Sequence, residues 1–169
     1  MRNQIATTQN PVTLPSGVPD NLAPPTPYDQ LRKAGLRPTR QRLALADLLL
    51  SGGDRHVTAE SLHSEATQKW PELCQKYGRM GTISLATIYN NLHDFTAVGL
   101  LKRLTVDTGR IWYDTNIHDH HHFYLPEQEI LLDIDPKLIE LAKLPTLPDG
   151  ASLQRIDITI RLAASNPGN

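Results

Sequence analysis

The chain has 169 residues, of which 39% are hydrophobic and 21% are charged, and its formal net charge at pH 7 is −1. This composition excludes a disordered tail protein and a highly charged nucleic-acid coat. The single cysteine, Cys74, excludes an intrachain disulfide framework and suits a reducing cytoplasm. No apolar run approaches the roughly 18 residues that cross a membrane, and no signal peptide is recognisable. We therefore expect a cytoplasmic protein with no membrane partner.

The charges are distributed unevenly along the chain. Residues 28–113 carry twelve basic and eight acidic side chains, a net +4, whereas residues 114–169 carry four basic and nine acidic ones, a net −5. Such a split is typical of a nucleic-acid-facing domain joined to a different module. We predict a disordered, proline-rich arm over residues 1–27, a DNA-binding domain over 28–113 and a second domain over 114–169.

The DNA-binding half predicts four helices. The capping positions are occupied by Thr or Ser, and glycines or Trp70-Pro71 follow the helices. The predicted helices cover about residues 28–34, 40–50, 59–69 and 85–97. Residues 71–83 are expected to form a long connection that looks like an insertion. Residues 101–113 alternate around the turn 107–109, which indicates a β-hairpin. This order predicts a winged helix-turn-helix, in which helix 85–97 enters the major groove and the hairpin is the wing.

The second half predicts a small β-β-α-β unit. Strands are expected over 120–125 and 129–134, a helix over 136–144, and a last strand within the alternating segment "LQRIDITIRL". A unit of this size is barely stable alone, so we expect it to form a homodimer. The predicted fold class is α+β, with an N-terminal winged helix-turn-helix domain and a small C-terminal α/β dimerisation domain.

The segment "DTNIHDHHHFYLPEQEILLD" holds four of the seven histidines within residues 118–122. His120 and His122 lie two apart on a predicted strand, so both project from the same face. Two imidazoles with nearby carboxylates suit Fe²⁺, Mn²⁺ or Zn²⁺. The alternative is that these histidines form a solvated turn without a ligand.

These segments together resemble the ferric uptake regulator (Fur) family over about residues 28–162. The matching pieces are "GLRPTRQRLALADLLL", "HVTAESLH", "ISLATIYNNLHDFTAVGLLKRL" and the His-rich strand with an acid eleven residues after His122. The pieces "GLRPTRQR", "DTNIHDHHHF" and "RIDITIRL" are most similar to the iron response regulator (Irr) branch. The resemblance implies a winged helix and a dimerisation domain with metal sites between them.

The sequence departs from the family pattern at its cysteines. The CxxC pairs of the family's structural zinc site are missing, and the first would fall at Leu125 and Gln128. We therefore expect no structural zinc bound by four cysteines. The Cys-Pro haem motif of some Irr proteins is also missing, because Cys74 precedes Gln75.

The resemblance implies ligand sets. The inter-domain regulatory metal site would consist of His56, Asp114, His120, His122 and Asp133. A second metal site would use Asp119, His121 and Glu140, although the histidine expected near Ala163 or Ala164 is absent. In the Irr branch the triple histidine is associated with haem, so haem binding at His120, His121 and His122 is a further hypothesis.

The resemblance also places residues on DNA. Tyr89 matches a family tyrosine that packs against thymine methyl groups, and Asn90 stands where many relatives carry arginine, which predicts a different base preference. The other predicted DNA contacts are Arg37, Thr39, Arg40, Arg42, Ser84, Thr87, Lys102, Arg103 and Arg110. A solvated charged face is the alternative for the arginines.

The sequence thus predicts a homodimeric transcriptional regulator of iron and haem homeostasis that represses from an A·T-rich, pseudo-palindromic operator. Metal or haem at the His-rich inter-domain site would be the signal. One alternative is a peroxide- or manganese-responsive regulator of the same family. A metalloenzyme or a metal or haem storage module is an alternative of another class. No general-base or nucleophile motif favours an enzyme, and storage would leave the winged helix without a purpose.

Overall fold

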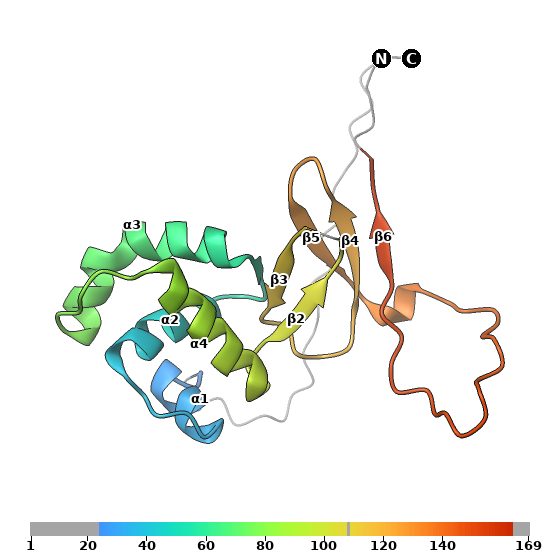
Figure 1. Cartoon of the computed structure of the whole chain (residues 1–169), viewed down its shortest axis with the longest axis horizontal. Coiled ribbons are helices and arrows are strands. Elements are labelled where there is room, and N and C mark those ends of the chain that lie inside the picture. The colour runs from blue at the N-terminus through green and yellow to red at the C-terminus, as the bar shows by residue number, and fades with distance from the viewer. Residues whose placement is uncertain (1–23, 108, 164–169) are drawn as a thin grey trace, which may run out of the picture.

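The computed structural model describes residues 24–107 and 109–163. Helices form one half of this part, and two three-stranded sheets form the other (Figure 1). The combination confirms the predicted α+β class. Most of the predicted disordered arm, residues 1–23, lies outside the described residues. Within them, no helix is long and apolar enough to span a membrane.

Four α-helices build the helical half, and local capping explains where each begins. A Thr or Ser side chain precedes each helix and accepts a hydrogen bond from the backbone N–H three residues on, as predicted. The helices are α1 (Pro27–Lys33), α2 (Arg40–Leu50), α3 (Ala59–Tyr77) and α4 (Leu85–Ala97).

Helix α3 is longer than predicted. It continues through Pro71 to Tyr77 and ends at Gly78, whose φ of 88° lies in the region that favours glycine. Buried Leu73, a 2.8 Å hydrogen bond from Trp70 Nε1 to the Gly81 carbonyl, and a 2.7 Å ion pair between Lys76 and Asp47 hold this extension. Tertiary packing therefore outweighs the interrupting effect of proline. The prediction that residues 71–83 form a long connection was wrong for residues 71–77, which are helical, and the connection to α4 begins only at residue 78.

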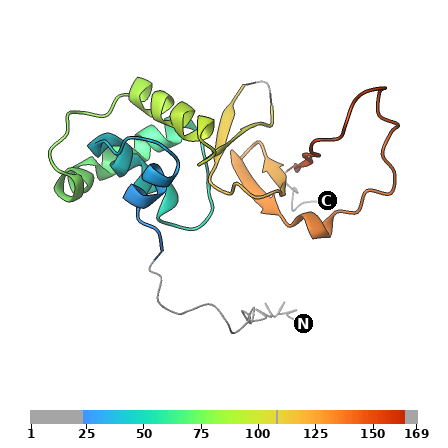
Figure 2. The ribbon, with the colours of Figure 1, turned by 90° about the horizontal axis from the view of Figure 1, so that it is seen from below.

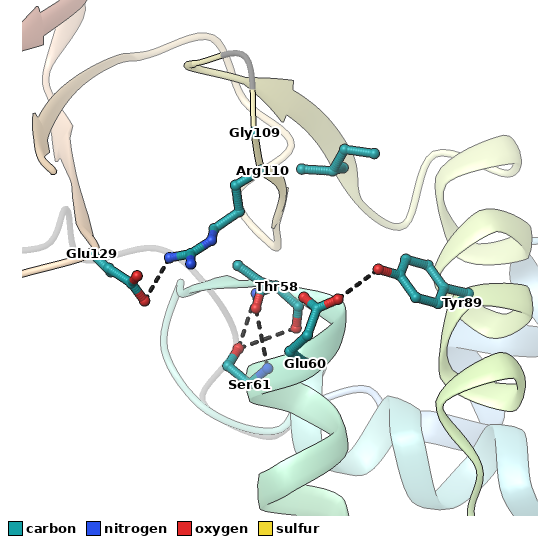
Figure 3. Close-up of a pocket in the computed structure, with 8 residues that line it drawn as sticks. Thr58, Glu60, Ser61, Tyr89, Gly109, Arg110 and Glu129 are labelled. Carbon is teal, nitrogen blue, oxygen red and sulfur yellow. Dashed lines mark hydrogen bonds and ion pairs between the residues drawn. The ribbon is translucent and has the colours of Figure 1, made fainter.

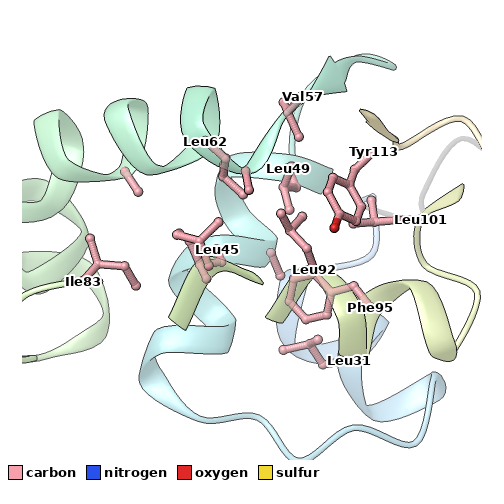
Figure 4. Packing of buried hydrophobic residues seen from close by; sticks show 14 residues of the cluster. Leu31, Leu45, Leu49, Val57, Leu62, Ile83, Leu92, Phe95, Leu101 and Tyr113 are labelled. Atoms are coloured by element: carbon pink, nitrogen blue, oxygen red, sulfur yellow. The ribbon is translucent and has the colours of Figure 1, made fainter. Parts of the chain in front are cut away.

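The core of the helical half is contributed by all four helices and the adjoining strands (Figure 4). Ile88, Leu92 and Phe95 recur on one face of α4 and are fully inaccessible to solvent. They pack with Leu45 and Leu49 of α2 in the same cluster. This packing fixes α4, which leaves Tyr89 and Asn90 on its exposed side.

Two sheets follow. The first has the order β1–β3–β2 and is antiparallel, which confirms the predicted hairpin and adds a two-residue strand that was not predicted. Its strands are β1 (His56–Val57), β2 (Lys102–Thr105) and β3 (Ile111–Asp114). The second has the order β5–β4–β6, with β4 antiparallel to β5 and parallel to β6. Its strands are β4 (His121–Leu125), β5 (Ile130–Ile134) and β6 (Thr159–Arg161).

A small cluster of buried side chains joins the two sheets. Trp112 of β3 packs against Tyr124 of β4 and Leu131 of β5, with the two aromatic rings edge-on at 6.5 Å. The Tyr124 hydroxyl also donates a 2.7 Å hydrogen bond to Asp107 of the wing turn. The winged helix and the second sheet are therefore in direct contact. The predicted boundary between residues 113 and 114 falls inside β3, before its last residue, Asp114, which pairs within the first sheet.

The segment after β5 differs from the prediction. In place of a helix over 136–144 there is one turn of 3₁₀-helix, Pro136–Leu138, and no helix or strand is assigned from residue 139 to 158. The segment extends away from both sheets (Figure 2). A nine-residue helix needs an apolar surface to pack on. Several leucines here are exposed on the single chain, namely Leu138, Leu141, Leu144, Leu147 and Leu153.

Candidate metal centre

The two sheets bring five predicted metal ligands to one place. His56 of β1 lies directly opposite Asp114 of β3 in the first sheet, and His122 of β4 lies directly opposite Asp133 of β5 in the second. His120 immediately precedes β4. Strand pairing therefore sets two ligand pairs, and the contact between the sheets brings the pairs together.

The ligand atoms lie close to one another. One atom from each of His56, Asp114, His120 and His122 falls within 4.8 Å of all the others. His120 Nε2 is 2.9 Å from His122 Nε2 and 2.9 Å from Asp114 Oδ2. Asp133 Oδ1 lies 3.1 Å from His56 Nε2. Ligand atoms about 2.0–2.1 Å from a tetrahedral metal would be about 3.3 Å apart, so these separations match a coordination shell.

Hydrogen bonding leaves buried atoms of this cluster without partners. His120 Nδ1 donates to the His118 carbonyl at 2.8 Å, which directs the Nε2 lone pair of a neutral ring to the cluster. Asp114 Oδ2 and His56 Nε2 are buried and make no hydrogen bond of normal geometry, although His120 Nε2 lies 2.9 Å from the first and Asp133 Oδ1 lies 3.1 Å from the second. A buried polar atom without a partner costs about 1–3 kcal/mol. A cation at this point would satisfy these atoms, so the residues present fit a divalent metal.

The Asp114 carboxyl is suited to remain ionised. Burial raises its pKa, but the imidazoles of His122 and His56 and the backbone N–H of Asn116 outweigh burial and hold the pKa below its usual range. The Asn116 amide donates to Asp114 Oδ1 at 2.8 Å. Three imidazoles and two carboxylates form a nitrogen- and oxygen-rich set, which suits Fe²⁺, Mn²⁺ or Zn²⁺.

The predicted second metal site is not assembled. Asp119 has a side chain that is 82% exposed and lies 3.4 Å from Lys102. His121 projects from the opposite face of β4, and Glu140 lies in the exposed segment after β5. Among the described residues, the only group of three or more potential ligands in mutual reach is the one around Asp114.

The predicted haem ligands do not line an open pocket on one side of the strand. His120 and His122 are buried, and their Nε2 atoms face each other at 2.9 Å, whereas His121 points to the other side of the strand. Axial ligation of a haem iron by His120 or His122 would require the cluster to open.

The predicted DNA-contacting residues fall into two groups. Some are engaged within the chain: Arg42 pairs with Asp94, Lys102 donates to the His118 carbonyl at 2.5 Å, and Arg110 pairs with Glu129 at 2.5 Å. Thr39 and Ser84 cap helices, and Thr87 bonds Ser84. The exposed candidates are Arg37, Arg40, Tyr89, Asn90 and Arg103, of which Arg40 also donates to the Arg79 carbonyl and Tyr89 to Glu60.

Two contacts around one cavity were missed by sequence reasoning (Figure 3). The Tyr89 hydroxyl donates to Glu60 Oε1 at 2.6 Å, and Arg110 reaches Glu129, which belongs to the turn between β4 and β5. These residues line a cavity of about 550 Å³ between α3, α4 and the wing. Tyr89 lies 29 positions after Glu60, and Glu129 lies 19 positions after Arg110. No local sequence pattern signals either contact.

Cys74 lies on α3, away from the cluster, with Sγ 3.9 Å from the Met80 carbonyl. Because it is the only cysteine, we expect the purified protein to hold no cysteine-bound zinc. Its dimer should survive alkylation of Cys74, which sedimentation before and after iodoacetamide treatment would check. Dissociation on alkylation would instead reveal a structural role for this thiol.

The model of the Ferric uptake regulator family matches residues 33–160. The chain is 36% identical over 115 residues to the peroxide-responsive repressor PerR of Staphylococcus epidermidis, covering 68% of this chain and 69% of that protein. The corresponding repressor of Staphylococcus aureus is 34% identical over 115 residues, covering 68% and 70%. These relatives do not confirm an assignment to the Irr branch.

Solved structures share the fold. Fur of Pseudomonas aeruginosa with manganese aligns with a TM-score of 0.55 at 23% identity and covers 81% of this chain and 96% of that one. Fur of Vibrio cholerae aligns with a TM-score of 0.59 at 22% identity, covering 81% and 98%. The family match spans both the helical half and the His/Asp cluster. The chain belongs to the Ferric uptake regulator family.

Proposed function

We propose that this protein is a homodimeric, sequence-specific transcriptional repressor whose DNA-binding geometry is set by a divalent metal held between its two sheets. The observation that carries this proposal is the convergence of ligand atoms from both sheets within 4.8 Å. Members of the family are metal-responsive transcriptional regulators that bind DNA as dimers, and they are not enzymes. The metalloenzyme and storage alternatives therefore receive no support.

The proposed ligands connect the two halves of the chain. His56 and Asp114 come from the sheet of the winged helix, and His120, His122 and Asp133 come from the second sheet or its edge. A bound ion would supply positive charge that satisfies the buried acceptors of both sheets at once. A metal ion would bind more tightly when the ligands of both sheets meet than when they are apart. This difference in affinity would shift the protein toward the arrangement in which they meet.

We propose Fe²⁺ or Mn²⁺ as the physiological signal, because two carboxylates beside three imidazoles favour harder cations. Response to peroxide is the second candidate, supported by identity of 36% and 34% to two peroxide-responsive repressors. Regulation of iron and haem genes rests on the Irr-like sequence pieces alone. Direct haem binding is the least favoured signal, since the imidazoles of His120 and His122 are buried against each other.

Direct DNA titration tests the proposal. Fluorescence anisotropy at a fixed salt concentration would compare an A·T-rich pseudo-palindrome with a scrambled duplex. Each duplex would be titrated with apo protein and with protein loaded with Mn²⁺, Fe²⁺ or haem. The titration with the Fe²⁺-loaded protein would be repeated after peroxide treatment. We expect metal to raise specific affinity and leave scrambled binding unchanged. Equal affinity for both duplexes in every state would refute the proposed function, and a response to haem alone would replace the metal signal.

Tyr89 offers a prediction on sequence readout. Tyr89 is 40% exposed on α4, and its hydroxyl donates to Glu60, so we expect the ring edge to meet a thymine methyl group. Tyr89→Ala should weaken specific binding by about 1–3 kcal/mol. Tyr89→Phe, which keeps the ring, should weaken specific binding much less. Anisotropy titrations of both variants check this, and equal losses would assign the role to the hydroxyl instead.

A further inference from the structure

We propose that Asn116 is a positioning residue that holds the two carboxylates of the metal centre in place before metal binds. This inference rests on the proposed function of the site. Asn116 is not a proposed ligand, and it follows β3 in the segment that leads to the second sheet. No charge or metal-binding chemistry marks it in the sequence.

Asn116 contacts both carboxylates. Its backbone N–H donates to Asp114 Oδ1 at 2.8 Å, and its side-chain Nδ2 donates to Asp133 Oδ2 at 2.7 Å. The other oxygen of each carboxylate faces the imidazoles: Asp114 Oδ2 lies 2.9 Å from His120 Nε2, and Asp133 Oδ1 lies 3.1 Å from His56 Nε2. Each acid thus has one oxygen fixed by Asn116 and the other directed to the centre.

The segment around Asn116 is itself anchored. The Asn116 Oδ1 atom accepts from the His118 backbone N–H at 3.2 Å, which closes a local turn and fixes the side-chain amide. Thr115 exchanges hydrogen bonds with Arg55, the residue before His56, including a 2.9 Å bond from the Arg55 N–H to the Thr115 hydroxyl. The side-chain amide is therefore aimed at Asp133 by contacts on the winged-helix side.

Asp133 has the greatest need for such support. Its side chain is 32% exposed, whereas that of Asp114 is fully buried and surrounded by histidines. An exposed carboxylate can rotate away and be solvated, and it would pay ordering entropy when it bound metal. Outer-shell hydrogen bonds to ligands commonly contribute about 10- to 100-fold in metal affinity. Asn116 spans from the end of β3 to β5, so it would also order the inter-sheet geometry of the apo protein.

Two substitutions isolate the contact with Asp133, since the backbone bond to Asp114 survives both. Asn116→Ser keeps a side-chain oxygen for the His118 N–H but is too short to reach Asp133, and Asn116→Leu keeps the size and loses the donor. We expect each to lower Mn²⁺ affinity of the full-length dimer by about 10- to 100-fold in direct titration. Gln75→Leu, an amide-to-leucine change at an exposed position of α3, should leave affinity unchanged.

A double-mutant cycle separates positioning from general damage. If Asn116 acts through Asp133, Asn116→Ser should cost nothing further in an Asp133→Ala background. The visible spectrum of the Co²⁺-loaded protein should shift in Asn116→Ser as it does in Asp133→Ala. Wild-type affinity in both Asn116 variants, or full additivity in the cycle, would overturn the inference. Failure of the wild type itself to bind Mn²⁺ or Co²⁺ would instead overturn the proposed function.

Discussion

The double variant His120→Ala/His122→Ala is expected to lose metal binding and, with it, metal-dependent recognition of DNA. It removes two of five proposed ligands, both buried and both within 3.6 Å of Asp114 Oδ2. Loss of outer-shell partners alone costs about 10- to 100-fold, so loss of two ligands should lower Mn²⁺ affinity by more than about 100-fold. Calorimetric Mn²⁺ titration and DNA anisotropy with and without Mn²⁺ would measure the two effects.

A matched control lies in the same stretch. His118→Ala removes a neighbouring exposed histidine but keeps the carbonyl that orients His120, so its metal affinity should equal that of the wild type. Apo stability should also change. Since the double variant also removes imidazoles that stabilise the buried Asp114 carboxylate, it should unfold in EDTA at a lower temperature than the wild type, and its loss of Mn²⁺ affinity is the result that reports ligation. Marked apo destabilisation with unchanged Mn²⁺ binding would make these histidines structural.

The positions of the proposed metal ligands were more predictable than their surroundings. The period of a strand places His120 and His122 on one face without any knowledge of the fold. His56 and Asp114 needed the family resemblance, because 58 residues separate them and only the pairing of β1 with β3 joins them. Asn116 was missed since an asparagine after a strand is an ordinary turn residue. Its distinction is a bond to Asp133, which depends on how the two sheets meet.

The errors in secondary structure have the same origin. Pro71 is a strong local signal to end a helix, and the pattern missed that Trp70, Leu73 and Lys76 all gain tertiary contacts by continuing α3. Residues 136–144 show the converse. Asp135 as a cap and Pro136 at the first helical position predict a helix, yet on the single chain its leucines have no surface to pack against and remain exposed. Local patterns therefore failed where tertiary packing decided whether a helix continued or formed at all.

Leu132 marks a surface that should be essential for dimerisation. On β5 it lies opposite Phe123 of β4, and Phe123 lies beside Ile160 of β6, so the three side chains form an apolar stripe across the second sheet. Leu132 is 50% exposed and Ile160 is 38% exposed on the single chain. An open apolar sheet face of this kind is suited to pack against a second copy.

We expect Leu132→Glu to raise the dimer dissociation constant by at least about 100-fold, because a central charge would be buried without a partner. Tyr28→Glu, the same change at an exposed aromatic residue of α1, should leave the dimer intact. Sedimentation velocity over a range of protein concentrations measures both. The monomeric variant should still fold its helical half, whose core lies elsewhere, and should bind a half-site more weakly than the dimer binds the palindrome. An unchanged dimer in Leu132→Glu would place the interface on another face, and the leucines of residues 138–153 would then be the next surface to test.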